Sequence, residues 1–106
     1  MKISIVTVAF NSAGTIADTL QSVASQTCTV EHIIVDGGSE DKTVELINRY
    51  GTHVSKMISE PDKGIYDAMN KGLNLATGNV IGFLNADDVY THERVLEKVC
   101  EIMILY

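Results

Sequence analysis

The sequence predicts an α/β fold with three layers, α/β/α, in which a doubly wound, mostly parallel, Rossmann-like sheet is covered by helices on both faces. Two observations support this class. Short runs of β-branched residues alternate with longer stretches of helical period, which is typical of βαβ units. The first of these runs is almost continuously apolar, as expected for a strand that is buried on both faces.

The first half of the chain predicts two pairs of strand and helix. Residues 3–9 (ISIVTVA) form the first expected strand, and apolar residues at helical spacing predict a helix over roughly 13–26. The run HIIVD at 32–36 is the second strand. Two glycines and a serine then turn the chain into a helix over 41–50.

The second half continues the alternation. A third strand is expected near 54–59 and a third helix over 65–76, with Gly78 in the left-handed position that ends such a helix. Residues 79–84 (NVIGFL) predict the fourth strand. Thr91 is the expected N-cap of a last helix.

Length and composition indicate one globular domain over 1–106. Of the 106 residues, 45% are apolar, which excludes disorder, and the 8 basic against 14 acidic side chains leave a net charge of −6. This acidic balance argues against nonspecific nucleic-acid binding, which depends on Lys and Arg. It leaves room for a small phosphorylated ligand, which backbone amides and a metal ion can hold.

Cysteine use and hydropathy bear on the compartment. Cys28 and Cys100 lack any metal-ligand spacing and are interpreted as reduced thiols, which favours a reducing compartment. The apolar run 1–10 breaks at Asn11 without a small-residue cleavage site, so it predicts a strand rather than a signal peptide. No stretch approaches the ~20 apolar residues of a membrane span.

Polar segments follow three of the predicted strands. Strand one ends at Phe10-Asn11, strand two at Asp36, and strand four at the acidic loop 85–88 (NADD). Right-handed crossovers place the carboxyl ends of parallel strands at one edge of the sheet, where open sheets bind ligands. The sequence therefore predicts a ligand site at that edge.

Asp87 and Asp88 are candidate metal ligands. Mg²⁺ and Mn²⁺ need only one or two carboxylates together with substrate phosphates. The alternative is that both are solvated loop acids, one of them helping to cap the next helix.

Asp36 can accept hydrogen bonds from a nucleobase or a ribose, or serve only as a turn residue. Lys63 in the loop PDKG can meet a diphosphate, although a simple turn explains that loop equally well.

Four segments together resemble the nucleotide-sugar-binding half of GT-A fold, family 2 glycosyltransferases. They are SIVTVAFNS, IIVDGGSEDKT, SEPDKGIYDAMNKGLNLATG and VIGFLNADDVY, which occur in the family's order and spacing over about residues 2–95. The third segment further resembles the bacterial branch that builds colanic acid and related exopolysaccharides or O-antigens.

The resemblance implies roles for individual residues. Val8 and Phe10 match positions that line the uracil pocket, and Asp36 matches the acid that binds the base. Lys63 and Gly64 lie where the family approaches the nucleotide. Asn85-Ala86-Asp87 matches the DXD motif with Asn in place of the first Asp, and Asp87, helped by Asp88, matches the metal ligand. The predicted nucleotide-binding residues are therefore Val8, Phe10, Asn11, Asp36, Lys63, Gly64, Asn85 and Asp87, and the predicted metal ligands are Asp87 and Asp88.

By resemblance, the reaction is metal-dependent sugar transfer, with inversion, from a nucleotide diphosphate donor to an acceptor. A UDP-sugar is the favoured donor, Mn²⁺ or Mg²⁺ the cofactor, and a saccharide or lipid-linked molecule the acceptor. The implied location is the cytoplasm, including the inner face of the membrane. The family's general base lies well beyond the DXD motif on an acceptor-binding half, so we expect this chain to be a donor domain without full catalysis. The apolar ending CEIMILY (100–106) then predicts self-association through an exposed helix.

Two other interpretations remain open at this point. The chain can be a noncatalytic nucleotide-sugar-binding or interaction module. It can also be a receiver-like doubly wound domain, although that class needs an acid on its third strand and a Lys on a fifth.

Overall fold

Strands and helices alternate along the chain in the computed structural model, which describes residues 2–99. The strands are β1 (Ile3–Ala9), β2 (Glu31–Asp36), β3 (Lys56–Ser59) and β4 (Val80–Phe83), and the helices are α1 (Ile16–Ala24), α2 (Thr43–Tyr50) and α3 (Ile65–Leu75). Residues 95–99 are also helical. The predicted alternation and the α/β class are therefore confirmed.

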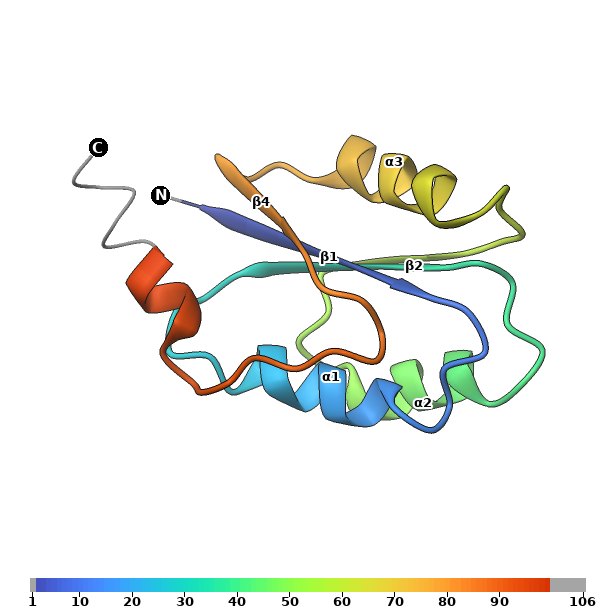
Figure 1. Ribbon diagram of the computed structural model, residues 1–106, viewed down its shortest axis with the longest axis horizontal. Coiled ribbons are helices and arrows are strands. Elements are labelled where there is room, and N and C mark those ends of the chain that lie inside the picture. The colour runs from blue at the N-terminus through green and yellow to red at the C-terminus, as the bar shows by residue number, and fades with distance from the viewer. Residues whose placement is uncertain (1, 100–106) are drawn as a thin grey trace.

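The strands form one parallel sheet in the order β3-β2-β1-β4. The chain first moves outward from β1 to β2 and β3, and then crosses back to place β4 on the other side of β1. Because right-handed crossovers in opposite directions put helices on opposite faces, α1 and α2 cover one face and α3 covers the other (Figure 1). The strand order reverses between β1 and β4, which makes their carboxyl ends the expected place for a ligand.

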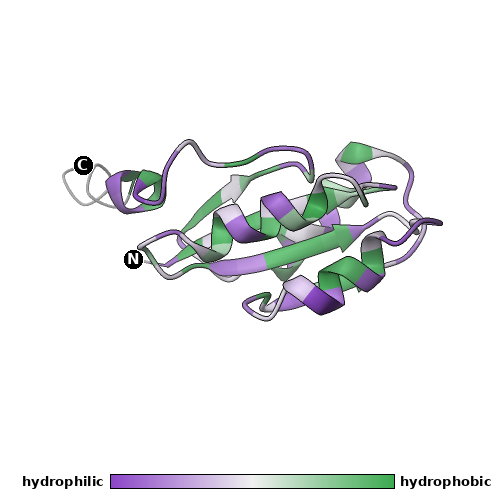
Figure 2. Cartoon of the chain, turned by 90° about the horizontal axis from the view of Figure 1, so that it is seen from below, coloured by the Kyte–Doolittle hydropathy of each residue, from purple (hydrophilic) through white to green (hydrophobic). Residues whose placement is uncertain are grey.

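Each face of the sheet has its own apolar core. On the side of α1 and α2, Ile34 of β2 packs with Ile16, Leu20 and Ile47. On the side of α3, the neighbouring residues of β2 pack with Ala68. This alternation explains why every residue of β2 is buried, and Figure 2 shows the same contrast, with helices banded in green and purple and a mostly green strand between them.

Glu31 ties the elements together at the amino edge of the sheet. Its carboxylate accepts hydrogen bonds from Ser4 Oγ at 2.7 Å and from the backbone N–H and Oγ1 of Thr77 at 2.9 Å each. Lys2 and Lys56 add ion pairs at 3.4 and 3.5 Å. The hydrogen bonds from Thr77 and Ser4 outweigh the opposing effect of burial and lower the pKa of Glu31 to about 2.

The last helix starts later than the sequence predicts. Thr91 is not its N-cap, because residues 92–94 follow a non-helical path and are held by the segment just after α1. Gln26 Nε2 donates to the carbonyl of His92 at 2.8 Å, and the N–H of Thr27 donates to the carbonyl of Glu93 at 2.8 Å. Gln26 Oε1 then accepts the N–H of Leu96 at 3.0 Å, so a side chain from the segment just after α1 caps this helix.

Gly78 does not end α3 in the left-handed conformation, so that prediction is wrong. Helix α3 ends at Leu75, and the next residue, Ala76, is extended. Gly78 is needed instead for close packing, since a Cβ there would lie 2.6 Å from Ser4 Oγ and 2.9 Å from the carbonyl oxygen of Lys2.

Among the described residues, no helix is both long and apolar enough to span a membrane. The ending 100–106, on which the prediction of self-association rests, lies outside the described residues.

Candidate functional site

The carboxyl ends of β1, β2 and β4 lie side by side at one edge of the sheet (Figure 1). Beyond the last paired residues, the N–H of Gly37 donates to the carbonyl of Ala9 at 2.8 Å. On the other side of β1, the N–H of Ala86 donates to the carbonyl of Val8 at 3.1 Å. The three polar segments that the sequence places at this edge are therefore neighbours in space.

Asn11 joins the end of β1 to the loop after β2. Its φ of 49° lies in the left-handed region, which Asn adopts more readily than most residues. Its N–H donates to Ser39 Oγ at 2.8 Å, and its side-chain oxygen accepts the N–H of Glu40 at 2.9 Å. Asn11 therefore fixes the two loops relative to each other.

Asp36 is fully buried and bonded within the protein. Its Oδ1 accepts from Ser39 Oγ at 2.5 Å, and its Oδ2 accepts from the N–H groups of Gly38 and Ser39 at 3.1 and 2.9 Å. Ser59 Oγ, at the end of β3, also donates to Oδ2 at 2.9 Å. Asp36 thus organises the loop after β2 and holds it against β3.

A cavity of about 440 Å³ opens at this edge between the end of β1 and the start of α3. Asp62 contributes a carboxylate to a lining that is otherwise mainly apolar, and Phe10 is 60% exposed at the cavity. Its lining residues are Val8, Ala9, Phe10, Gly37, Asp62, Gly64, Ile65 and Ala68. An apolar pocket with few polar groups is typical of a small-molecule site.

A second cavity of about 380 Å³ lies next to the first, because Val8 and Ile65 line both. Its other lining residues are polar or small: Asn11, Ser12, Thr15, Asn85, Ala86 and Asp87. Asp87 is exposed, and within residues 2–99 its carboxylate has no hydrogen-bond or ion-pair partner. The paired cavities thus combine an apolar compartment with a compartment that carries an available carboxylate.

Helix α1 holds the acidic loop 85–88 in place. Thr15 Oγ1 donates to the carbonyl of Ala86 at 2.8 Å. Thr19 Oγ1, which is fully buried, lies 2.9 Å from the same carbonyl and 2.8 Å from that of Asp88. Ser22 continues the stripe, since its Oγ accepts the N–H of Tyr90 at 2.6 Å.

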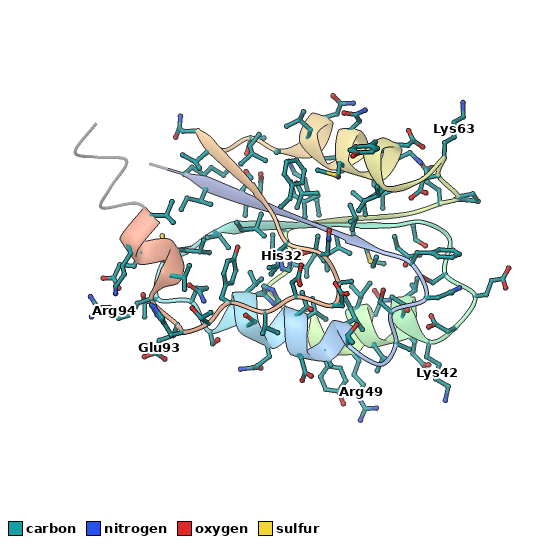
Figure 3. The ribbon with its side chains drawn as sticks, in the orientation of Figure 1. His32, Lys42, Arg49, Lys63, Glu93 and Arg94 are labelled. Atoms are coloured by element: carbon teal, nitrogen blue, oxygen red, sulfur yellow. The ribbon has the colours of Figure 1, made fainter. Side chains whose placement is uncertain are left out.

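Some of the predicted site residues line the cavities and some do not. Those at a cavity are Val8, Phe10, Asn11, Gly64, Asn85 and Asp87. Asp36, Lys63 and Asp88 line neither one, and Figure 3 shows Lys63 pointing away from the body of the molecule. The backbone N–H of Lys63 donates to Asp67 at 2.9 Å.

The residues that sequence reasoning missed had weak signals. Ile65 and Ala68 are apolar and spaced i, i+3, a pattern that predicts only a core-facing side of α3, yet Ile65 is 49% exposed and both line the first cavity. Thr15, Thr19 and Ser22 follow a helical period, which marks one polar face of α1 but does not say what that face binds.

The described residues contain no group of three or more His, Cys, Asp or Glu side chains that could hold a metal ion by itself. A cation of the Mg²⁺ type does not need one, because it keeps several waters and takes one or two carboxylates plus substrate phosphates. Asp87 and the amide oxygen of Asn85 offer a donor set of this kind at the second cavity.

One histidine lies in the core of the protein. His32 is fully buried between the sheet and the α1 and α2 layer (Figure 3). Its Nε2 lies 2.8 Å from Thr7 Oγ1, and its Nδ1 lies 2.9 Å from His53 Nε2. Burial, together with the proximity of His53, lowers the pKa of His32 to about 3, so this ring is neutral at pH 7.

Comparisons with known proteins identify the family. Residues 4–104 match the sequence model of Glycosyl transferase family 2. The chain is 38% identical over 100 residues to a "PGL/p-HBAD biosynthesis glycosyltransferase" of Mycobacterium bovis, a match that spans 91% of this chain and 39% of that relative. The chain thus spans about two fifths of the length of this curated relative.

Solved structures share the fold. The crystal structure of S. aureus TarS 1-349 in complex with UDP-GlcNAc superimposes with a TM-score of 0.89 at 23% identity, covering 99% of this chain and 32% of that one. A second structure is glucosyl-3-phosphoglycerate synthase from Mycobacterium tuberculosis, solved with Mn²⁺, UDP and glucosyl-3-phosphoglycerate. It superimposes with a TM-score of 0.66 at 26% identity, covering 80% of this chain and 33% of that one. These matches exclude the receiver-like alternative. With its parallel sheet, its paired cavities at the strand-order reversal and a family match over nearly its whole length, the chain belongs to glycosyl transferase family 2.

Proposed function

We propose that this chain binds the nucleotide-sugar donor of a metal-dependent, inverting glycosyltransferase. The observation that carries the proposal is the pair of adjoining cavities at the carboxyl ends of β1 and β4. One compartment is mainly apolar, as a base requires, and the other presents the carboxylate of Asp87, as a metal-bound diphosphate requires. UDP is the favoured nucleotide, since the glucosyl-3-phosphoglycerate synthase with 26% identity was solved with UDP and Mn²⁺.

Mn²⁺ or Mg²⁺ is the proposed cofactor, held by Asp87 with Asn85 beside it. When bound, the metal would act as a Lewis acid for the charge on the departing diphosphate. The protein itself contributes by holding the side chains of Asn85 and Asp87 in position. Thr15 and Thr19 hold the carbonyl of Ala86, between these two residues, and so fix the direction in which both side chains leave the backbone.

The general base belongs to another part of the protein in this proposal. Among residues 2–99, Asp87 is the only carboxylate that lines the second cavity. A carboxylate that holds the metal cannot also take the acceptor's proton. The proposal therefore assigns 1–106 to donor binding and acceptor binding to residues outside the chain, in line with the greater length of the curated relative.

The acceptor is a saccharide or a lipid-linked molecule of a bacterial surface polysaccharide, and we place the reaction in the cytoplasm at the inner face of the membrane. A relative named for PGL/p-HBAD biosynthesis supports a surface-glycan role, and the two cysteines support a reducing compartment.

Calorimetric titration with UDP, with and without MnCl₂, tests the proposal. We expect UDP binding that strengthens with Mn²⁺, and we expect Asp87→Asn to remove this strengthening. Asp18→Asn on the exposed side of α1 removes the same charge and serves as the control. UDP binding that does not depend on Mn²⁺ would contradict the metal site, and no UDP binding at all would contradict the donor site.

A further inference from the structure

Two carboxylates lie near the end of β2, and only one of them faces a cavity. Asp36 is buried, and both of its oxygens accept hydrogen bonds from the protein's own donors. Asp62, from the loop between β3 and α3, lines the apolar cavity. The two acids are far apart in sequence, but the pairing of β2 with β3 brings their loops together.

The carboxylate of Asp62 lies directly over Gly37. A Cβ at Gly37 would be 2.7 Å from Asp62 Oδ2 and 3.2 Å from its Cγ, so another residue at this position would push the Asp62 carboxylate out of its place. Gly37 has no positive φ, so its backbone alone would accept another residue. The glycine is therefore explained by the space that Asp62 occupies.

One oxygen of Asp62 is engaged and the other is available. Oδ1 accepts the N–H of Gly64 at 3.1 Å, which fixes the orientation of the carboxylate. In the described part of the chain, Oδ2 has no hydrogen-bond donor. Asp62 thus offers an oriented, charged acceptor to a ligand in a cavity whose other lining side chains are apolar.

We propose that Asp62 is the residue that determines base specificity, with Oδ2 accepting the ring N–H of the nucleobase. This inference rests on the proposed function and names the recognition element within it. Uracil carries a ring N–H donor, whereas the corresponding cytosine nitrogen carries a lone pair. An ionised carboxylate only accepts hydrogen bonds, so it pairs with uracil and repels cytosine.

The first test compares UDP and CDP binding to the chain in the presence of MnCl₂. We expect the unmodified chain to prefer UDP. Asp62→Asn retains an oxygen for Gly64 and removes the charge. We expect it to weaken UDP binding roughly tenfold to a hundredfold and to abolish most of the preference. Glu40→Gln, at the same edge but away from both cavities, is the control and should leave the UDP-to-CDP ratio unchanged.

The second test moves the carboxylate from residue 62 to residue 37, the residue that it contacts. Gly37→Asp alone places two acids in one space, and we expect weaker UDP binding. Combining Gly37→Asp with Asp62→Ala vacates the space and supplies an acid from the loop after β2, so we expect the preference for UDP over CDP to return. Circular dichroism and thermal melting establish that each variant is folded.

The outcomes separate this inference from the proposed function. If UDP binds with Mn²⁺ but Asp62→Asn keeps the unmodified UDP-to-CDP ratio, the role of Asp62 is wrong and the donor site stands. Failure of the double variant to regain the preference, although folded, would also contradict the inference. If the unmodified chain binds no UDP, the proposed function itself fails.

Discussion

His32 shows how one buried side chain can set the acid stability of this protein. The ring of His32, from the amino-terminal end of β2, lies between Thr7 and His53 and stacks on the His53 ring with a centroid distance of 5.1 Å. Its two nitrogens are both engaged, so the neutral ring is satisfied without a charge. Burial disfavours the protonated form of each ring, so the pKa values of both His32 and His53 are lowered.

We expect the free energy of unfolding to fall as pH drops below about 6.5. The unfolded chain takes up a proton on His32 near its ordinary pKa of 6.5, whereas the folded protein resists until about pH 3. Stability is therefore present above 6.5 and is lost toward pH 3, by at most about 1.4 kcal/mol per pH unit.

Urea unfolding at several pH values measures this slope. His32→Gln removes the titrating group and should flatten the dependence between about pH 6.5 and 4.5, at some cost in stability from repacking. The exposed His92→Gln is the matched control and should retain the slope. An unchanged slope in folded His32→Gln would show that other groups carry the acid sensitivity.

At the scale of elements, α1 does two tasks with two faces. Ile16, Leu20 and Val23 face the sheet, whereas Thr19 and Ser22 face the segment that follows β4, and Thr15 and Gln26, which flank the helix, extend this polar stripe at its two ends. The polar stripe binds that segment from Ala86 to Leu96, along the length of the helix. The helix that packs β1 therefore also positions the loop that carries Asp87.

Thr19→Val should weaken Mn²⁺-dependent UDP binding while leaving the protein folded. The substitution conserves size and leaves the carbonyls of Ala86 and Asp88 without this donor, which we expect to cost about 1–3 kcal/mol of unfolding free energy. The freed loop no longer holds Asp87 in one place. Thr19→Ser, which keeps the hydroxyl, is the matched control.

Calorimetry with UDP and MnCl₂, alongside thermal melting, checks this expectation. Thr19→Ser should retain most of the Mn²⁺-dependent UDP binding that Thr19→Val loses. Equal loss in both variants would point to the methyl packing at residue 19 and against a role for the hydroxyl.

At the scale of the whole molecule, the two edges of the sheet have different tasks. The carboxyl edge carries the cavities and an available carboxylate, Asp87. The amino edge carries Glu31, which joins β1, β2, β3 and the segment before β4 through hydrogen bonds and ion pairs. Stability and ligand binding are therefore separable by mutation.

Glu31→Gln should destabilise the protein and leave UDP binding unchanged. The amide keeps the shape but loses the charge that Ser4, Thr77, Lys2 and Lys56 surround, and we expect a loss of about 1–3 kcal/mol of unfolding free energy. Glu97→Gln, whose ion pair with Arg94 is exposed and screened by solvent, should destabilise the protein much less than Glu31→Gln. Urea unfolding and UDP calorimetry on the same variants make the comparison. A changed UDP affinity in Glu31→Gln would show that the two edges are coupled.

The strands and helices were predictable because their signals are local. Residues 3–9 form β1 as predicted, and the other strands and helices differ from prediction mainly at their ends. The start of the last helix was not predictable, since it depends on Gln26, a side chain from a distant segment. Gly78 was misinterpreted for a similar reason, because its neighbour is Ser4 at the opposite end of the chain.

The sequence by itself determined the α/β class, the edge at which polar residues gather, and Asp87 and Asn85 as residues at that edge. These follow from periodicity and from the handedness of crossovers, which depend on residues close together in the chain. Only the tertiary structure decided that Asp36 is bonded internally while Asp62 faces the cavity. That choice depends on the packing of the loop after β3 against Gly37, a contact between distant segments that no local pattern encodes.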